Sequence, residues 1–442
     1  MKKSLLVRTL TFFLLFFGIV PPGQAKDLAD QLDGLFGPDG ITLTPTIPSH
    51  QAHFNSISAA TLGLLTQQLA PSAADFPAIS TTPGFTFRYD PQIQAFERSS
   101  ESLGSVYVER PQTLGGGKFD IGFSYLYVDF DELNGEDLDG LNFRLQHNDC
   151  CQPRFDPPAP HDPAFEEDFI DLTFDKFSLR SHVMSFFATY GITDRWDVNL
   201  LLPVVYTVFK VKAHAHINNI GSAGLIPNFP DGIHFFDPSG RVDDFSTIDD
   251  DKTGVGDMQL RTKYHLFEHG KFNVGAGLAL RLPTGSEGNF QGLGDTTLTP
   301  FLALSQEYDR FDFHASGGIQ INTDDTDRSL IRYGGGVTVK IIEQIALLVD
   351  VIGSSSLQTV QLSRTVKDSI TEGEFPNITI TEVTRTATRN FHTDQVDLNV
   401  GFKTSPFGTE RSVVGFATVF VPLNDDGLRS DAIPAVGLQV GF

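Results

Sequence analysis

Hydrophobic and polar residues alternate along much of the chain with a period of two, most clearly at its C-terminal end. There, Val436, Leu438, Val440 and Phe442 are separated by single glycine and glutamine residues. Successive side chains of a β-strand point to opposite faces, so this segment predicts a strand with one apolar face. In a soluble protein such a strand would be an uncovered, aggregation-prone edge. In an outer-membrane β-barrel the apolar face contacts lipid and closure removes the edge.

The same alternation recurs throughout the C-terminal three quarters of the chain. In one of the clearest segments, Leu260 and Tyr264 lie on one face, and Arg261 and Lys263 on the other. Most segments reach the roughly 9–11 residues that a tilted membrane strand needs, and we count about twelve of them. Those at 176–191 and 295–307 alternate least well. The predicted strands are 118–129, 176–191, 196–210, 254–266, 271–283, 295–307, 311–322, 330–341, 344–353, 392–403, 411–421 and 433–442.

Short and long connections follow one another in strict order between these strands. The tight turns lie at 192–195, 267–270, 308–310, 342–343 and 404–408. The long loops, acidic and rich in glycine and proline, are 131–175, 211–253, 284–294, 323–329, 354–391 and 422–432. With both termini in the periplasm, every tight turn lies on the periplasmic side and every long loop outside, as in transmembrane barrels. We therefore predict an all-β, antiparallel transmembrane barrel over residues 116–442.

The N-terminal quarter has a different organisation. Residues 1–25 combine a basic start with an apolar run and small residues before a cleavage point, which predicts a secretory signal peptide. Residues 26–115 contain possible short helices at 27–36 and 59–69 and a small hairpin within 84–98. This part is either a poorly ordered periplasmic extension or a plug inside the barrel. A lumen of about twelve strands would otherwise be open or need filling, which favours the plug.

The net charge and the residue composition exclude some classes of protein. The formal net charge of −23 excludes a general nucleic-acid binder. The 39 phenylalanines and 41 glycines against three methionines are typical of an aromatic- and glycine-rich β-protein. The two cysteines, Cys150 and Cys151, are too few for a disulfide framework. Adjacent in one loop, they could form a strained bridge, pair between chains or remain free thiols, and we expect a local role at most.

Several turn-and-strand motifs carry a family resemblance. They are Tyr190–Asp197 (YGITDRWD), 202–205 (LPVV), 254–264 (GVGDMQLRTKY), 280–285 (LRLPTG) and the upstream stretches 107–115 and 119–130. In this order and spacing they resemble the phenol-degradation MetA-pathway transporter family of outer-membrane proteins. The resemblance covers most of the chain from about residue 96 onward. It implies a channel-like barrel that takes up hydrophobic or aromatic compounds, without catalytic residues or cofactors.

The polar face of the predicted strands supplies the candidate lumen lining. Two interpretations of these side chains are open. Mixed charges along a lumen would screen solutes by polarity and size. Alternatively, they form a buried network of ion pairs that fills a narrow barrel. The candidates are Asp257, Gln259, Arg261, Lys263, His265, Arg281, Asp312, His314, Gln320, Arg332, Asp397 and Lys403.

The loops carry weaker signals for metal ions. The stretch 129–140 is rich in oxygen ligands around a glycine, but its spacing misses the EF-hand pattern, so we expect a solvated acidic loop. His214 and His216 would share one strand face and make half of a metal site, without an evident third ligand. We therefore expect no metal ion. The sequence contains no Walker loop, HExxH, CxxC or serine elbow, so we expect no enzyme.

The sequence thus predicts a passive outer-membrane channel for small hydrophobic or aromatic molecules. The alternative is a barrel that transports nothing and uses its acidic loops for adhesion or envelope structure. The expected partners are outer-membrane lipid, the barrel-assembly machinery and a small-molecule solute. Phe442, as a terminal aromatic residue in register with the apolar face, is the expected assembly signal.

Overall fold

The computed structural model describes residues 26–44, 51–82, 84, 86–90, 95–98, 103–147, 168–223, 231–374, 377–391, 394–406 and 413–442. The expected signal peptide and the two cysteines lie outside these ranges. The helices are α2 (Leu28–Asp33) and α3 (Asn55–Ala73), and the 3₁₀ turns are η3 (Glu287–Asn289) and η4 (Thr326–Arg328). Among the described residues, no helix is both long enough and apolar enough to cross a bilayer.

Twelve antiparallel strands of the described chain form a closed barrel, which confirms the predicted fold class. Each strand pairs with the previous barrel strand, and β21 closes the ring by pairing with β3. The barrel strands are β3 (Phe119–Phe130), β7 (Phe169–Thr193), β8 (Trp196–Asn218), β10 (Gln259–His269), β11 (Phe272–Arg281), β12 (Thr297–Tyr308), β13 (Phe311–Asn322), β14 (Leu330–Ile342), β15 (Ile345–Ser356), β18 (Gln395–Thr404), β19 (Val413–Pro422) and β21 (Ile433–Gly441).

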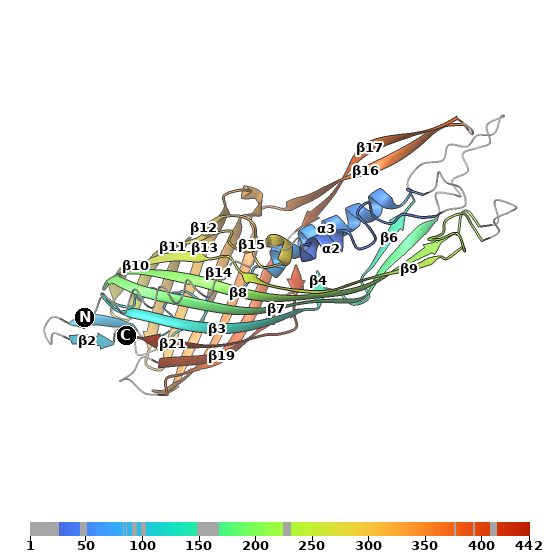
Figure 1. Cartoon of the computed structure of the whole chain (residues 1–442). Coiled ribbons are helices and arrows are strands. Elements are labelled where there is room, and N and C mark those ends of the chain that lie inside the picture. Colours follow the sequence, from blue (N-terminus) through green and yellow to red (C-terminus); the bar gives the residue numbers. More distant parts are fainter. Residues whose placement is uncertain are drawn as a thin grey trace, which may run out of the picture.

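The remaining strands lie outside the ring. Figure 1 shows β16 and β17 as a projecting ribbon and β6 and β9 at the far ends of β7 and β8. They are β1 (Phe87–Asp90), β2 (Ala95–Arg98), β4 (Glu132–Leu133), β5 (Glu136–Asp137), β6 (Asn142–Gln146), β9 (Asp243–Val255), β16 (Val360–Glu374), β17 (Asn377–Phe391) and β20 (Leu428–Arg429). The hairpin of β1 and β2 lies at the end of the barrel with the tight turns.

Several expected loops therefore contain strands, and the predicted ends of two barrel strands were wrong. β7 and β8 have 25 and 23 residues and continue well into stretches predicted as loops. β9 lies mostly within the predicted loop that β8 also enters, has the acidic sequence DDFSTIDDDKTGV and includes the first residues of the predicted strand 254–266. In the outer parts of β7 and β8 the alternation is inverted, because Ile170, Leu172, Val211 and Ile217 are buried inside the wall. An outward apolar face, the signal used to locate the strands, therefore does not mark these parts.

The wall of the barrel has an apolar outside and a polar inside. Along β10, Leu260 and Tyr264 are 52% and 47% exposed, whereas the intervening Arg261 and Lys263 are 4% and 1% exposed. This alternation matches a strand between lipid and a filled lumen. At the long-loop end, α2 and α3 pack their leucines against apolar side chains of the extended β7 and β8, so a hydrophobic core lies inside the wall.

Candidate functional site

The N-terminal segment occupies the lumen. From the end of α3 at the long-loop end, residues 74–82 run down inside the barrel to the hairpin of β1 and β2 at the tight-turn end. Residues 103–115 then return into the lumen before β3 begins. Most side chains of these two stretches are buried. Lumen-facing side chains of the barrel contact the segment at three levels, described here from the tight-turn end upward.

At the tight-turn end, Lys403 of β18 holds the returning chain. Its ammonium group donates hydrogen bonds of 2.7, 2.8 and 2.8 Å to the backbone carbonyls of Leu103, Gly104 and Ser105. The Lys403 side chain is fully buried. Three carbonyl acceptors match the three donors of an ammonium group, so the buried charge is solvated by the segment itself.

A second buried cation lies beside this contact. Arg110 of the segment is fully buried, forms an ion pair of 3.7 Å with Asp312 of β13, and donates hydrogen bonds to two backbone carbonyls. Gly104 adopts a positive φ of 61°, and a Cβ atom there would lie 2.0 Å from the Arg110 guanidinium. Only glycine fits this close approach. Nearby, Asp350 of β15 accepts hydrogen bonds from Ser105 (2.6 Å) and from His314 (2.7 Å).

At the middle level, Glu109 of the segment lies between two barrel cations. Arg261 and Lys263 of β10 are 3.5 and 3.7 Å from its carboxylate oxygens. Lys263 also donates a 2.7 Å hydrogen bond to Thr82, and Arg261 donates to Asn199 of β8. One carboxylate therefore balances two buried positive charges, with hydrogen bonds serving the remaining donors.

At the upper level, the carboxylate of Asp75 and the backbone carbonyl of Ala74, which accepts a 2.9 Å hydrogen bond from Arg281, hold the segment. Asp75 accepts hydrogen bonds of 2.6 and 2.7 Å from Arg332 of β14 and one of 3.2 Å from Arg281 of β11. Burial raises the pKa of Asp75, but the two guanidinium groups outweigh it and hold the pKa below 3.8. Asp75 is therefore ionised at neutral pH and links two strands to the end of α3.

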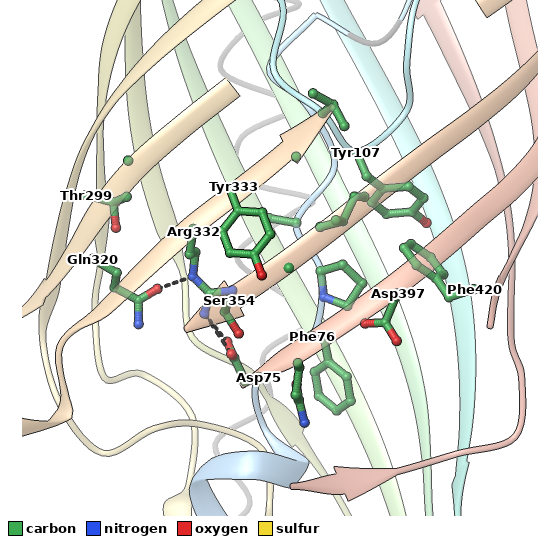
Figure 2. A pocket seen from close by; sticks show the side chains of 18 of the residues that line it. Asp75, Phe76, Tyr107, Thr299, Gln320, Arg332, Tyr333, Ser354, Asp397 and Phe420 are labelled. Atoms are coloured by element: carbon green, nitrogen blue, oxygen red, sulfur yellow. Dashed lines mark hydrogen bonds and ion pairs between the residues drawn. The ribbon is translucent and has the colours of Figure 1, made fainter. Parts of the chain in front are cut away.

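Above the middle level, segment and wall leave a cavity of about 240 Å³. Figure 2 shows Phe76, Tyr107 and Phe420 on one side of it and Arg332 and Asp75 on the other. Burial raises the pKa of Tyr107, so its hydroxyl keeps its proton and stays a hydrogen-bond donor. The cavity thus combines aromatic and charged side chains, with Asp397 beside Phe76 and Phe420 and with Tyr333 beside Arg332, and such a mixture of apolar and hydrogen-bonding groups is typical of small-molecule sites.

A smaller cavity of about 90 Å³ lies next to the first on the long-loop side. Both are lined by Ser72, Asp75, Gln320, Ser354 and Gln395. The smaller cavity also touches Arg328 and Leu330, at the loop between β13 and β14. The two cavities therefore lie in series from the long-loop end towards the middle of the lumen.

The sequence-predicted lumen residues fall into three groups. Arg261, Lys263, Arg281, Arg332 and Lys403 bind the N-terminal segment directly, as described above. Gln259, Gln320 and Asp397 line the larger cavity. Asp397 pairs at 3.2 Å with Arg429 of β20, and Gln320 accepts from Arg332.

The third group faces other partners. Asp257 pairs at 2.9 Å with Arg281 and accepts backbone hydrogen bonds from the loop between β11 and β12. His265 is hydrogen-bonded to Asn273 of the neighbouring strand. Asp312 and His314 belong to the buried cluster at the tight-turn end. Filling of the lumen, one of the two interpretations left open by the sequence, describes the lower and middle levels, whereas Gln259, Gln320 and Asp397 line a cavity; the screening of solutes stays a prediction.

The residues of the segment itself were missed by sequence reasoning. Asp75, Glu109 and Arg110 supply the segment's charges in its ion pairs with the wall, yet they lie in stretches without periodicity. The stretch 107–115 was noted as part of the family resemblance, which gave its side chains no role. Their partners become visible only once the strands of the wall are placed around them.

The loop candidates have mixed outcomes. His214 and His216 both donate to Asp243 of β9, at 2.8 and 2.7 Å, so the third group that the sequence did not reveal is present. In the acidic stretch 129–140, Asp139 accepts a hydrogen bond from the backbone of Phe177. Phe442 is 67% exposed on the apolar outer face and exchanges backbone hydrogen bonds with Phe119 of β3.

Comparison with protein families supports the resemblance noted in the sequence. The model of a family described as the MetA pathway of phenol degradation matches residues 173–339, from β7 to β14. The recognition made from the motifs is thereby confirmed. A comparison with curated protein sequences finds no match.

Three solved structures of outer-membrane proteins are similar to the chain. An outer-membrane channel from Pseudomonas putida F1 has 12% identity and a TM-score of 0.42, covering 75% of this chain and 97% of that one. A FadL homologue from Pseudomonas aeruginosa has 8% identity and a TM-score of 0.31, covering 74% and 89%. The translocator domain of the autotransporter NalP from Neisseria meningitidis has 10% identity and a TM-score of 0.28, covering 74% and 88%.

Proposed function

We propose that this protein is a passive outer-membrane channel for small aromatic molecules that carry a polar group, with residues 26–115 as its plug. The observation that carries the proposal is the cavity between plug and wall. Its aromatic side suits the ring of a solute, and the hydrogen-bonding groups of Tyr107, Ser354 and Arg332 suit a polar substituent.

The size of the cavity sets the substrate class. A dry protein cavity of about 150 Å³ holds one benzene molecule. The larger cavity here, of about 240 Å³, has room for one substituted ring and not for an extended acyl chain. The family description, which names phenol degradation, agrees with this class. We therefore favour single-ring aromatic compounds over fatty acids or alkanes.

Passage through the barrel requires the plug to shift. The cavities lie in series from the long-loop end to the middle level, where Glu109, Arg261 and Lys263 fill the lumen. A solute would enter from the long-loop side, rest against the aromatic wall and leave when residues 103–115 move. The Asp75 contacts near the cavity are the ones that a solute reaches first.

The experiment is solute flux into liposomes that contain the purified full-length protein. We expect entry of phenol and benzoate and exclusion of a trisaccharide. Thr299→Trp, which fills the cavity from β12, should reduce aromatic flux several-fold. The matched control is Leu302→Trp on the lipid-facing side of the same strand, where the side chain is 57% exposed. Absence of flux for every solute, with or without residues 26–115, would refute the channel.

The alternative of a barrel without transport has one observation in its favour. The tight-turn end of the lumen is filled by fully buried Lys403 and Arg110, with their partners from the segment. If liposomes stay impermeable while deletion of β16 and β17 abolishes surface attachment, the protein has an adhesive or structural role instead.

A further inference from the structure

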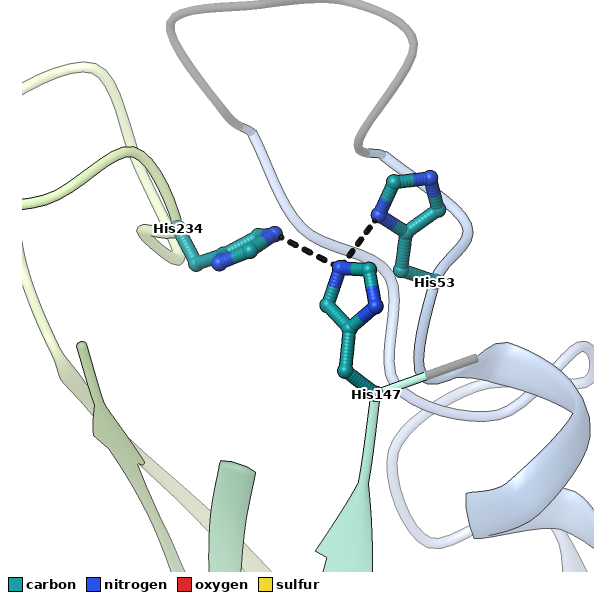
Figure 3. A group of neighbouring side chains, drawn as sticks. All are labelled: His53, His147 and His234. Atoms are coloured by element: carbon teal, nitrogen blue, oxygen red, sulfur yellow. Dashed lines mark hydrogen bonds between the residues drawn. The ribbon is translucent and has the colours of Figure 1, made fainter. Parts of the chain in front are cut away.

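We infer that His53, His147 and His234 form a binding site for a divalent transition metal, with Zn²⁺ as the best-suited ion. Three segments far apart in the sequence bring these rings together: the residues before α3, the end of β6 and the connection between β8 and β9 (Figure 3). The residues are 2%, 6% and 0% exposed. The inference does not depend on the proposed transport function.

The ring nitrogens converge on one point. Nδ1 of His53 lies 2.7 Å from Nε2 of His147, which lies 3.2 Å from Nε2 of His234, and all three nitrogens are within 4.8 Å of one another. Zinc–nitrogen bonds of about 2.0–2.1 Å in a tetrahedron place ligand nitrogens about 3.3–3.4 Å apart. The pair of His147 and His234 already has nearly this spacing, and His53 has to move away from His147 while staying within reach of His234.

The protons that the three rings can carry fit a bound metal ion better than hydrogen bonds alone. Nδ1 of His234 lies 2.8 Å from Asp168, a contact that requires a proton on that nitrogen. A neutral His234 therefore directs the lone pair of Nε2 towards His147. Without a metal ion, a neutral His234 requires the single Nε2–H of His147 to be shared between the lone pairs of His53 and His234. A metal ion accepts all three lone pairs while each ring stays neutral.

The surroundings resemble the outer shell of a metal site. Asp168 is fully buried, orients His234 and accepts backbone hydrogen bonds from Gly221 and Ser222 at 2.8 and 3.0 Å. A carboxylate behind a ligating histidine fixes its tautomer and raises its basicity. Phe54 packs edge-on against His147 and His234, with ring centroids 5.4 and 5.7 Å away, and limits access of water.

The second histidine cluster provides a contrast. In the cluster of His214, His216 and Asp243, both rings direct a nitrogen at the same carboxylate oxygen, at 2.8 and 2.7 Å. Two N–H donors on one acceptor are satisfied by protons without any metal ion. These rings are also partly exposed. Of the two clusters, only the buried one has nitrogens converging on one another.

A bound ion would fix the N-terminal segment at the long-loop end of the barrel. His53 directly precedes α3, and Asp75 follows this helix at its other end. Zn²⁺ would tie the start of α3 to β6 and to the loop before β9, while Asp75 ties its end to Arg281 and Arg332. The helix would then be fixed at both ends above the cavity.

The test is Zn²⁺ binding by the full-length, detergent-solubilised protein after removal of metals with a chelator. All proteins carry His216→Ala, which removes the second cluster. We expect one equivalent of Zn²⁺ by calorimetry and, with Co²⁺ as a probe, an absorption spectrum of tetrahedral nitrogen and oxygen coordination. His147→Gln should abolish stoichiometric binding, and Asp168→Asn should weaken it roughly 10–100-fold.

The matched control is His269→Gln, at an exposed tight turn, which should bind Zn²⁺ like the parent. No bound Zn²⁺ in the parent, or binding unchanged by His147→Gln, overturns the inference and assigns the cluster to hydrogen bonds between the rings. If His147→Gln does not fold, X-ray absorption of the Zn²⁺-loaded parent decides. Three imidazole ligands support the site, and fewer refute it.

Discussion

The two ends of the lumen hold the plug in different ways. At the tight-turn end, fully buried Lys403 and Arg110 bind backbone carbonyls and acidic side chains, and the segment fills the space. At the long-loop side, Asp75 accepts from Arg281 and Arg332, and Arg281 also donates to the carbonyl of Ala74, beside a cavity of about 240 Å³. The Lys403 contacts use backbone carbonyls of the segment, whereas most of the contacts around Asp75 depend on a carboxylate that one proton neutralises. We therefore expect the contact at the tight-turn end, the anchor of the segment, to hold it more firmly than the Asp75 contact does.

The largest effect is expected from breaking the anchor. Lys403→Met leaves three buried carbonyls without their donor, at a cost of about 3–5 kcal/mol. We expect residues 103–115 to become accessible to protease and the midpoint of urea unfolding to fall. Lys271→Met, at an exposed tight turn, should change stability by less than about 0.5 kcal/mol. Equal behaviour of the two variants would contradict the anchor.

A smaller, more local effect is expected from Asp75→Asn. The amide deprives Arg332 of this carboxylate, while Arg281 keeps its ion pair with Asp257, and the change should cost about 1–3 kcal/mol in this partly buried site. Hydrogen exchange should rise in residues 74–82 and stay unchanged in 103–105, and channel conductance in planar bilayers should increase. Asp39→Asn, exposed before α3, serves as the control. If 103–105 loosened equally, the two ends would not be independent.

The pH dependence of conductance tests the same difference between the two ends, because protonation of Asp75 changes the protein less than a substitution does. Burial raises the pKa of Asp75, but Arg332 and Arg281 lower it below 3.8, so the contact is intact above about pH 4. Protonation as the pH falls through this lowered pKa removes the stabilisation. Conductance of the wild type should therefore rise on acidification below pH 4, whereas Asp75→Asn should lack that step. The same acid response in both proteins would locate the titrating group elsewhere.

The smallest effect on the lumen is expected from deletion of Phe442, which faces away from it at the anchored end. Protein that has already folded should keep its heat-modifiable gel mobility and its conductance. Outer-membrane levels in cells should fall several-fold, because we expect the terminal aromatic residue to be the assembly signal. Phe311→Ala removes another exposed aromatic residue near a tight turn and should assemble normally. If the amount of protein in the outer membrane were unchanged without Phe442, this residue would not be the assembly signal.

Features of the barrel wall were predictable because their cause is local. Period-two alternation between lipid and lumen marks a strand without knowledge of its neighbours, so all twelve strands were located and their polar faces identified. The signal of an outward apolar face ended where β7 and β8 extend beyond most of the other barrel strands. There Ile170, Leu172, Val211 and Ile217 are buried inside the wall and the polar residues between them are less buried, whereas β9 is acidic along most of its length.

What the sequence determined by itself was therefore the wall: an acidic, closed barrel whose inner face carries charged side chains such as Arg261, Lys263 and Lys403. What only the tertiary structure decided was the pairing of those charges. Asp75 meets Arg332 across 257 positions, and His53 meets His147 across 94. Such contacts depend on the closure of the ring and on the path of a segment without periodicity. No local pattern encodes them, because each partner is an ordinary polar residue until the fold brings the other within a few ångströms.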